Sequence, residues 1–373
     1  MIRIASVQLQ LIVTSALLAF SAEAQQTASR PGFASLMASE AQGFERAIEP
    51  REFSFPTDHG PHPKFRTEWW YLTGHLETDS GDVFGTQVTF FRFALAPRTP
   101  KGASNWRSNA AFMAHFALTD VASQRFYHEE RFARAAAGLA GASSSPLKVW
   151  LEDWHLRQTG DGTFPWHVKL YGDGFAIDLD LQQDKAPVLN GNGGLSRKSA
   201  DPGNASYYYS MTRMPTKGFV EANGVRQAVS GTLWMDREWS SSALGQNQVG
   251  WDWFALQLAD GTDLMYYQLR ESGGGVSAES AGTFVTESGS YRQVSRSEVE
   301  LTVLDTWKSP HGPRTYPAKW RLRVASVGLD VVVEPRLADQ EHTGRFPYWE
   351  GAVTVSTVDG NRLGVGYVEL TGY

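Results

Sequence analysis

The sequence contains no cysteine among its 373 residues. This absence excludes disulfide bonds, thiolate catalysis and metal sites built on cysteine. Stability must therefore come from the burial of apolar side chains, for which the chain has 13 Trp, 13 Tyr and 20 Phe residues. The chain is also longer than one ordinary hydrophobic core requires, so about two domains are expected.

Clusters of positive charge are lacking as well. The formal net charge is −6, and no extended basic block occurs. Because nucleic-acid-binding surfaces are basic, a nucleic acid is not expected as a partner. The sequence also has no Gly-x-Ser-x-Gly motif, so a serine hydrolase built on a nucleophile elbow is not expected either.

Long apolar runs are scarce, and a short one lies near the N-terminus at residues 11–20. It is too short to cross a bilayer. Ala22-Glu23-Ala24 follows it and fits the small-x-small cleavage pattern of a secretory signal peptide. We therefore predict a signal peptide over residues 1–24, cleavage near Ala24-Gln25, and a periplasmic or secreted product. Residues 25–49 are polar and are expected to form an N-terminal arm.

After Pro50 the chain consists of many short segments in which apolar and aromatic residues alternate with polar ones. Residues 251–258 and 264–270 are an example, since Asp260-Gly261 between them is a strong signal for a β-hairpin. Long stretches with helical periodicity are rare. Many short strands at this spacing predict an all-β fold made of antiparallel sandwiches or barrels.

The segment from Glu68 to Leu76 combines three large aromatic residues with a carboxylate and a histidine. Its composition favours a strand, in which Glu68 and Trp70 share one face and His75 lies on the other. Burying a carboxylate between Trp rings costs free energy unless a partner is present. Glu68 is therefore either the anchor of a buried polar network or an acid that works in an aromatic-lined cavity.

Several separated motifs follow one another along the chain. They are His59-Gly60-Pro61-His62-Pro63, the segment from Glu68 to Leu76, Trp234-Met235-Asp236-Arg237-Glu238-Trp239, Gly250-Trp251-Asp252-Trp253-Phe254, Tyr316-Pro317 with Trp320, Tyr348-Trp349-Glu350-Gly351, and the ending Gly366-Tyr367-Val368-Glu369-Leu370-Thr371-Gly372-Tyr373. With these motifs the chain resembles the AttH and carotenoid 1,2-hydratase family of lipocalin-like proteins.

This resemblance covers roughly residues 50–373. It implies two lipocalin-like antiparallel β-barrel domains that pack together, with little helix and a ligand cavity. We place the first barrel at residues 50–238 and the second at residues 239–373. Members of the family include carotenoid hydratases, kievitone hydratase and fungal cyclases that fold polyenes.

Hydration or cyclisation of an alkene needs an acid that protonates carbon and aromatic faces that stabilise the resulting cation. Burial can keep such an acid protonated by raising its pKa. The candidate catalytic residues are Glu68, Asp236 and Glu238. The candidate ligand-binding residues are Trp70, His75, Arg237, Trp239, Trp251, Tyr267 and Trp349.

The chain departs from the carotenoid hydratases at two of these positions. Where the resemblance implies a His-x-Trp element, the chain has Arg237-Glu238-Trp239, and where it implies Tyr-x-Asp, the chain has Tyr266-Tyr267-Gln268-Leu269. The Trp and the Tyr are matched, whereas the His and the Asp are not. Acid catalysis here would therefore need other residues.

His59 and His62, with Glu68 as a third ligand, are a candidate metal site by residue type. Two prolines and the absence of helical spacing disfavour it, so neither a metal nor a cofactor is expected.

Three functions are consistent with these observations. The first is an exported lipocalin-like protein that binds a hydrophobic small molecule, such as a lipid or an isoprenoid, in an aromatic-lined cavity. The second is a hydro-lyase or cyclase that acts on a C=C bond of a polyene or prenyl group. The third is an accessory protein of an envelope transport system, which would dock to a partner protein. The sequence does not indicate an oligomeric state.

Overall fold

The computed structural model describes residues 42–98, 102, 104–242, 244, 245 and 247–373. The predicted signal peptide lies outside these residues, as does most of the predicted N-terminal arm. None of the described helices is long and apolar enough to cross a membrane.

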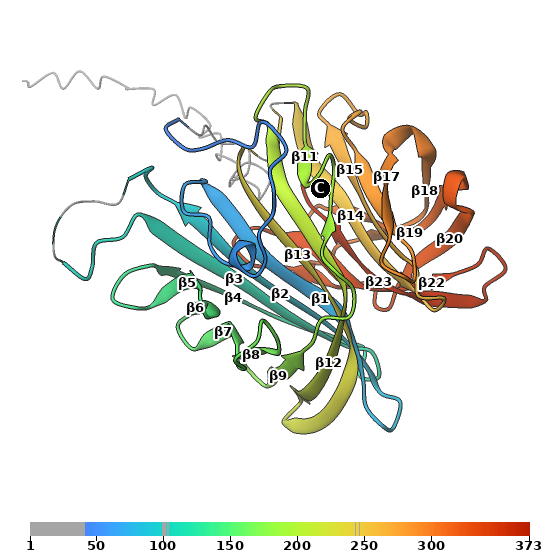
Figure 1. Ribbon diagram of the computed structural model, residues 1–373. Helices are drawn as coiled ribbons and strands as arrows, with labels where there is room; N and C mark the ends of the chain where they lie inside the picture. The colour runs from blue at the N-terminus through green and yellow to red at the C-terminus, as the bar shows by residue number, and fades with distance from the viewer. Residues whose placement is uncertain (1–41, 99–101, 103, 243, 246) are drawn as a thin grey trace, which may run out of the picture. The chain divides into compact units, whose positions relative to one another are not determined.

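The first sheet is antiparallel and contains the strands of residues 67–242 (Figure 1). In chain order they are β1 (Thr67–Glu77), β2 (Val83–Ala94), β3 (Ala110–Asp120), β4 (Arg125–Arg134), β5 (Ala140–Ser144), β6 (Leu147–Leu151), β7 (Trp154–Gln158), β8 (Trp166–Gly172), β9 (Phe175–Leu181), β10 (Val188–Leu189), β11 (Leu195–Arg197), β12 (Ala205–Ala222) and β13 (Val225–Ser242). They pair in the order β4-β3-β2-β1-β13-β12-β9-β8-β7-β6-β5, and β10 and β11 add to β12.

The second sheet is also antiparallel and is built from the rest of the chain. Its strands are β14 (Gln248–Leu258), β15 (Asp263–Glu271), β16 (Ala281–Val285), β17 (Tyr291–Ser295), β18 (Val299–Lys308), β19 (Thr315–Val324), β20 (Leu329–Pro335), β21 (Glu341–His342), β22 (Tyr348–Ser356) and β23 (Arg362–Leu370). They pair in the order β17-β16-β15-β14-β23-β22-β20-β19-β18, and β21 adds to β22. The described helices are short 3₁₀ turns: η1 (Thr57–His59), η2 (Arg296–Glu298) and η3 (Ala325–Val327).

These two sheets form one nearly closed barrel and one half-barrel. The predicted all-β fold with two lipocalin-like antiparallel barrels is thus confirmed. The division that we placed between residues 238 and 239 falls inside β13, whose pairing with β1 continues to Ser240. The second sheet begins at β14.

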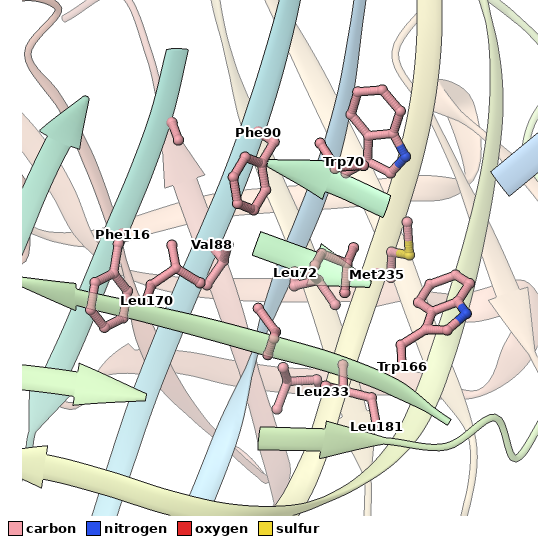
Figure 2. Close-up of a cluster of buried hydrophobic side chains, with 14 of the residues drawn as sticks. Trp70, Leu72, Val88, Phe90, Phe116, Trp166, Leu170, Leu181, Leu233 and Met235 are labelled. Atoms are coloured by element: carbon pink, nitrogen blue, oxygen red, sulfur yellow. The ribbon is translucent and has the colours of Figure 1, made fainter. Parts of the chain in front are cut away.

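Each sheet has its own core, and alternation along the strands decides which side chains enter it. Trp70 and Leu72 of β1 point into the first core together with Val88 of β2 and Met235 of β13 (Figure 2). The second core lies within the second sheet and includes Trp320.

A third cluster of buried residues joins the two sheets. From the first sheet it takes side chains on the opposite face of β1 and its neighbours, such as Tyr71 and Trp234. From the second sheet it takes residues such as Trp253 and Tyr267. Burial of a large apolar side chain stabilises a fold by about 1.5–3 kcal/mol, so this cluster holds the sheets together. The candidate site lies within it.

Candidate functional site

Glu68 lies in the first core, away from the space between the sheets. Its side chain is fully buried and forms ion pairs with Arg92 and Arg237. The backbone N–H of His62 donates to its Oε2 at 2.9 Å. Burial alone would raise the pKa of Glu68, but the two arginines and His62 bring it well below its ordinary value. Glu68 is therefore an ionised structural anchor and a poor proton donor.

Arg237 extends this ion-pair cluster between two indole rings. Its guanidinium carbon lies 3.9 Å from the ring centroid of Trp70 and 5.3 Å from that of Trp239. His62 stacks on the other ring, Trp239, at 3.7 Å between centroids. The structure thus brings Trp70, Arg237 and Trp239 together with Glu68 as one network on the first-core side of β1 and β13.

A separate cavity lies between the two sheets, within the third cluster. Its volume is about 80 Å³. Half of its lining residues are aromatic, namely Trp69, Tyr71, Phe91, Tyr208, Trp251, Trp253, Tyr267 and Tyr348. The charged and acidic residues in its wall are Lys198, Asp236, Glu238, Glu350 and Glu369.

Strand register explains how these residues meet. One row of neighbouring side chains crosses β15, β14, β23 and β22 and consists of Tyr267, Trp253, Glu369 and Glu350. Another row crosses β2, β1 and β13 and consists of Thr89, Tyr71 and Asp236. Each row presents one face of its sheet to the cavity, so both aromatic and acidic side chains face it.

Asp236 is buried and accepts hydrogen bonds from three side chains. Ser210 Oγ lies 2.5 Å from Oδ1 and Trp234 Nε1 lies 2.7 Å from the same oxygen, while the Tyr208 hydroxyl donates to Oδ2. Burial raises the pKa of Asp236 to about 7, although these three donors oppose the shift. Asp236 can therefore gain or lose a proton near neutral pH.

Glu350 and Glu369 lie directly opposite each other on β22 and β23. Tyr71 and Tyr348 hydrogen-bond to Glu350, and Trp251 hydrogen-bonds to Glu369. Burial raises the pKa of Glu350 well above its ordinary value, and repulsion from Glu369 adds to this. Burial also raises the pKa of Glu369. Two opposed carboxyl groups in such a setting hold at least one proton at neutral pH.

Glu238 differs from the other acids of the cavity because it has a cationic partner. Lys198 Nζ lies 3.1 Å from its Oε2, and Ser206 donates to the same oxygen. The ammonium group also lies 4.2 Å from the ring centroid of Tyr267. Among the described residues, no such cation pairs with Asp236, Glu350 or Glu369. Glu238 therefore contributes charge to the wall rather than a proton.

The remaining predicted residues are divided among three places. Trp251 and Tyr267 line the cavity. Trp349 lies in the second core, where its indole donates to Ala338 O at 2.8 Å. His75 lines a second pocket, of about 630 Å³, and its Nε2 lies 2.8 Å from Gly366 O. Burial lowers the pKa of His75 to about 4, so its ring is neutral.

Sequence reasoning did not select several residues of the cavity as site residues, namely Tyr71, Lys198, Tyr208, Tyr348, Glu350 and Glu369. Glu350 did carry a signal, because it directly follows Trp349 in one of the motifs that carry the family resemblance. Lys198 carried none, since it lies in the Gly-rich stretch before β12. The described residues contain no group of three His, Asp or Glu side chains that could hold a metal ion.

The acids of the cavity predict a dependence of stability on pH. A carboxyl group whose pKa rises on folding adds stability below its unfolded-state pKa, and this is lost as the pH rises through the folded-state pKa. For Asp236 this window runs from 3.8 to about 7. We expect the unfolding free energy, measured by urea unfolding, to fall less steeply with pH over this range in Asp236→Asn than in the parent protein. Equal slopes in the variant and the parent protein would contradict the assignment.

Comparisons with known proteins support the family suggested by the motifs. The AttH-like family model matches residues 46–373. The crystal structure of an AttH-like protein from Nitrosomonas europaea has a TM-score of 0.79 and 34% sequence identity, covering 88% of this chain and 100% of that chain. No match was found among curated proteins.

More distant structures share the fold alone. Kievitone hydratase from Nectria haematococca has a TM-score of 0.66 at 14% identity, covering 90% of this chain and 98% of that chain. CghA with Sch210972 has a TM-score of 0.52 at 11% identity, covering 90% and 97%. The family match over residues 46–373 and the relative with 34% identity show that this chain belongs to the AttH-like family.

Proposed function

We propose that the protein binds a small, largely apolar, unsaturated molecule between its sheets and adds a proton to a C=C bond of that molecule, as a hydro-lyase does. One observation carries the proposal: two opposed carboxyl groups, Glu350 and Glu369, face an aromatic-lined cavity and have no cationic partner among the described residues. Binding alone would not require buried acids, because burying polar groups costs free energy.

The walls of the cavity suit an apolar ligand. Aromatic faces such as those of Trp253 and Tyr267 provide contact area, and they also attract a developing carbocation by about 0.5–2 kcal/mol per ring. With a volume of about 80 Å³, the cavity suits a small molecule or one end of an elongated one. A prenyl end group has this character.

The acids then take complementary roles. The carboxyl O–H of Glu350, which lies opposite Glu369, gives its proton to one alkene carbon, and the π electrons form the new C–H bond. Water attacks the resulting cation at the other carbon and loses a proton to Asp236, which accepts it as a carboxylate. The net reaction adds one water molecule across the double bond. The same steps in reverse order eliminate water.

The name of kievitone hydratase indicates a hydration reaction, which is consistent with this chemistry on the same fold. At 14% identity that protein shares only the fold with this chain, and fold similarity does not carry an activity. The proposal therefore depends on the acids of this chain.

Native mass spectrometry of protein purified gently from its source cells tests the binding step. We expect a bound molecule that organic solvent extracts and that contains at least one C=C bond. Protein that carries no molecule from its source and takes up no short prenyl alcohol, such as geraniol, would contradict the proposal.

A further inference from the structure

Glu350 is connected to the surface of the first sheet by a continuous series of hydrogen bonds. Tyr348, two residues before it on β22, hydrogen-bonds to its carboxyl group. The Tyr348 hydroxyl lies 2.8 Å from Nδ1 of His115 on β3. On the far side of that ring, Nε2 lies 3.1 Å from Oε2 of Glu130 on β4. The series therefore crosses from the second sheet to the first.

The outer end of the series is partly exposed, whereas the groups before it are buried. Glu350, Tyr348 and His115 are buried. The side chain of Glu130 is 17% exposed, and its other oxygen accepts a hydrogen bond from the backbone N–H of Arg345 at 3.0 Å. The inner end thus faces the cavity and the outer end reaches solvent.

We propose that Tyr348, His115 and Glu130 form a proton relay that returns a proton from solvent to Glu350 after each turnover. This inference rests on the proposed function, because it assumes that Glu350 gives up a proton in the cavity. An acid that is enclosed by aromatic rings and by a bound apolar ligand has little contact with bulk water. Without another route it could be reprotonated only after the ligand had left.

The transfer balances with one tautomer of His115, in which Nδ1 carries the proton. Glu130 takes a proton from water and passes it to Nε2 of His115. The proton on Nδ1 moves to the Tyr348 oxygen, and the original hydroxyl proton of Tyr348 moves to the Glu350 carboxylate. One proton has then crossed from solvent to Glu350, and His115 is left as the other tautomer. Rotation of the ring does not change which nitrogen carries the proton, so the first tautomer returns only when Nδ1 takes up a proton and Nε2 releases one to Glu130.

The groups around His115 are compatible with this role. The His342 ring lies 5.7 Å from the His115 ring between centroids, and His128 lies 5.4 Å from His342. Burial lowers the pKa of His342 well below its ordinary value, and both neighbouring histidines lower it further. His342 is therefore neutral, and the charged groups beside the outer end of the relay are Glu130 and Arg345.

Infrared spectroscopy after rapid mixing into D₂O tests the relay without a substrate. Exchange of a carboxyl proton for deuterium shifts the C=O stretching band of a protonated glutamic acid. The contribution of Glu350 is identified as the band that Glu350→Gln removes. We expect its exchange to be at least about tenfold slower in Tyr348→Phe and in His115→Gln than in the parent protein.

Two further variants separate the relay from a structural effect. Tyr71→Phe removes the other hydroxyl that bonds to Glu350 and lies outside the series, so its exchange rate should match the parent rate. Glu130→Gln changes only the partly exposed end and should slow exchange. If Tyr348→Phe and Glu130→Gln both exchange as fast as the parent protein, the relay is overturned while the proposed function stands. If Glu350→Gln removes no band, Glu350 is ionised and the proposed function fails as well.

Discussion

Replacing Glu68 with alanine is expected to lower the free energy of unfolding by about 3–5 kcal/mol, because removal of one partner from a buried ion pair leaves the other charge unpaired. Both Arg92 and Arg237 would lose their carboxylate, and Arg237 is fully buried. Urea unfolding followed by tryptophan fluorescence measures this change. It is among the largest effects of a single substitution that we expect in this chain.

A matched control uses an ion pair at the surface. Glu300 and Arg323 lie 3.2 Å apart with both side chains largely exposed, and solvent screens such pairs. Glu300→Ala should therefore change the unfolding curve little. The double variant Glu68→Met with Arg237→Met should recover part of the loss, since it removes two of the three buried charges. A Glu68→Ala curve that superimposes on the Glu300→Ala curve would show that Glu68 is not the anchor.

Replacing Glu350 with glutamine is expected to lower kcat by about 10²–10⁴-fold, the usual contribution of a general acid. The amide has nearly the same shape but cannot give up a carboxyl proton. The turnover of the unsaturated molecule that co-purifies with the protein provides the measurement. Because the shape of the cavity is kept, KM should change much less than kcat.

Glu238→Gln is the matched control for this prediction. Glu238 also lines the cavity, but it is paired with Lys198. Its replacement should disturb the charge of the wall and affect KM more than kcat. If Glu350→Gln keeps the kcat of the parent protein while Glu238→Gln loses it, the roles of the two acids are reversed and our assignment is wrong.

The local features of the fold could be predicted from the sequence. The hairpin around Asp260-Gly261 is present as β14 and β15, with bounds that differ from the prediction by at most three residues. Alternation also placed Glu68 and Trp70 on the same face of one strand, and both are buried on the first-core side. These features depend on neighbours in sequence, so local patterns determine them.

The candidate site was predicted less well, and the sequence Asp236-Arg237-Glu238-Trp239 shows why. We assigned all four residues to the predicted site, two as acids and two as ligand-binding residues. In β13, however, Asp236 and Glu238 face the cavity between the sheets, whereas Arg237 and Trp239 face the first core. The alternation that was applied to Glu68 would also have separated these four residues.

Other parts of the site could not be read from one sequence. Glu369 lies beside Trp253 and Glu350 only because β23 pairs between β14 and β22. The pairing of β14 with β23 joins residues that are far apart in the chain, so neighbours in sequence do not specify it. The same holds for Tyr348 and His115, which belong to different sheets.

Incorporation of deuterium at carbon tests the central claim most directly. Purified protein would be incubated in D₂O with the molecule that it carries or with a short prenyl alcohol, and the product analysed by mass spectrometry. We predict one deuterium bound to carbon in each hydrated molecule with the parent protein, and none above background with Glu350→Gln. A ligand that occupies the cavity of the parent protein and is recovered without carbon-bound deuterium would contradict the claim.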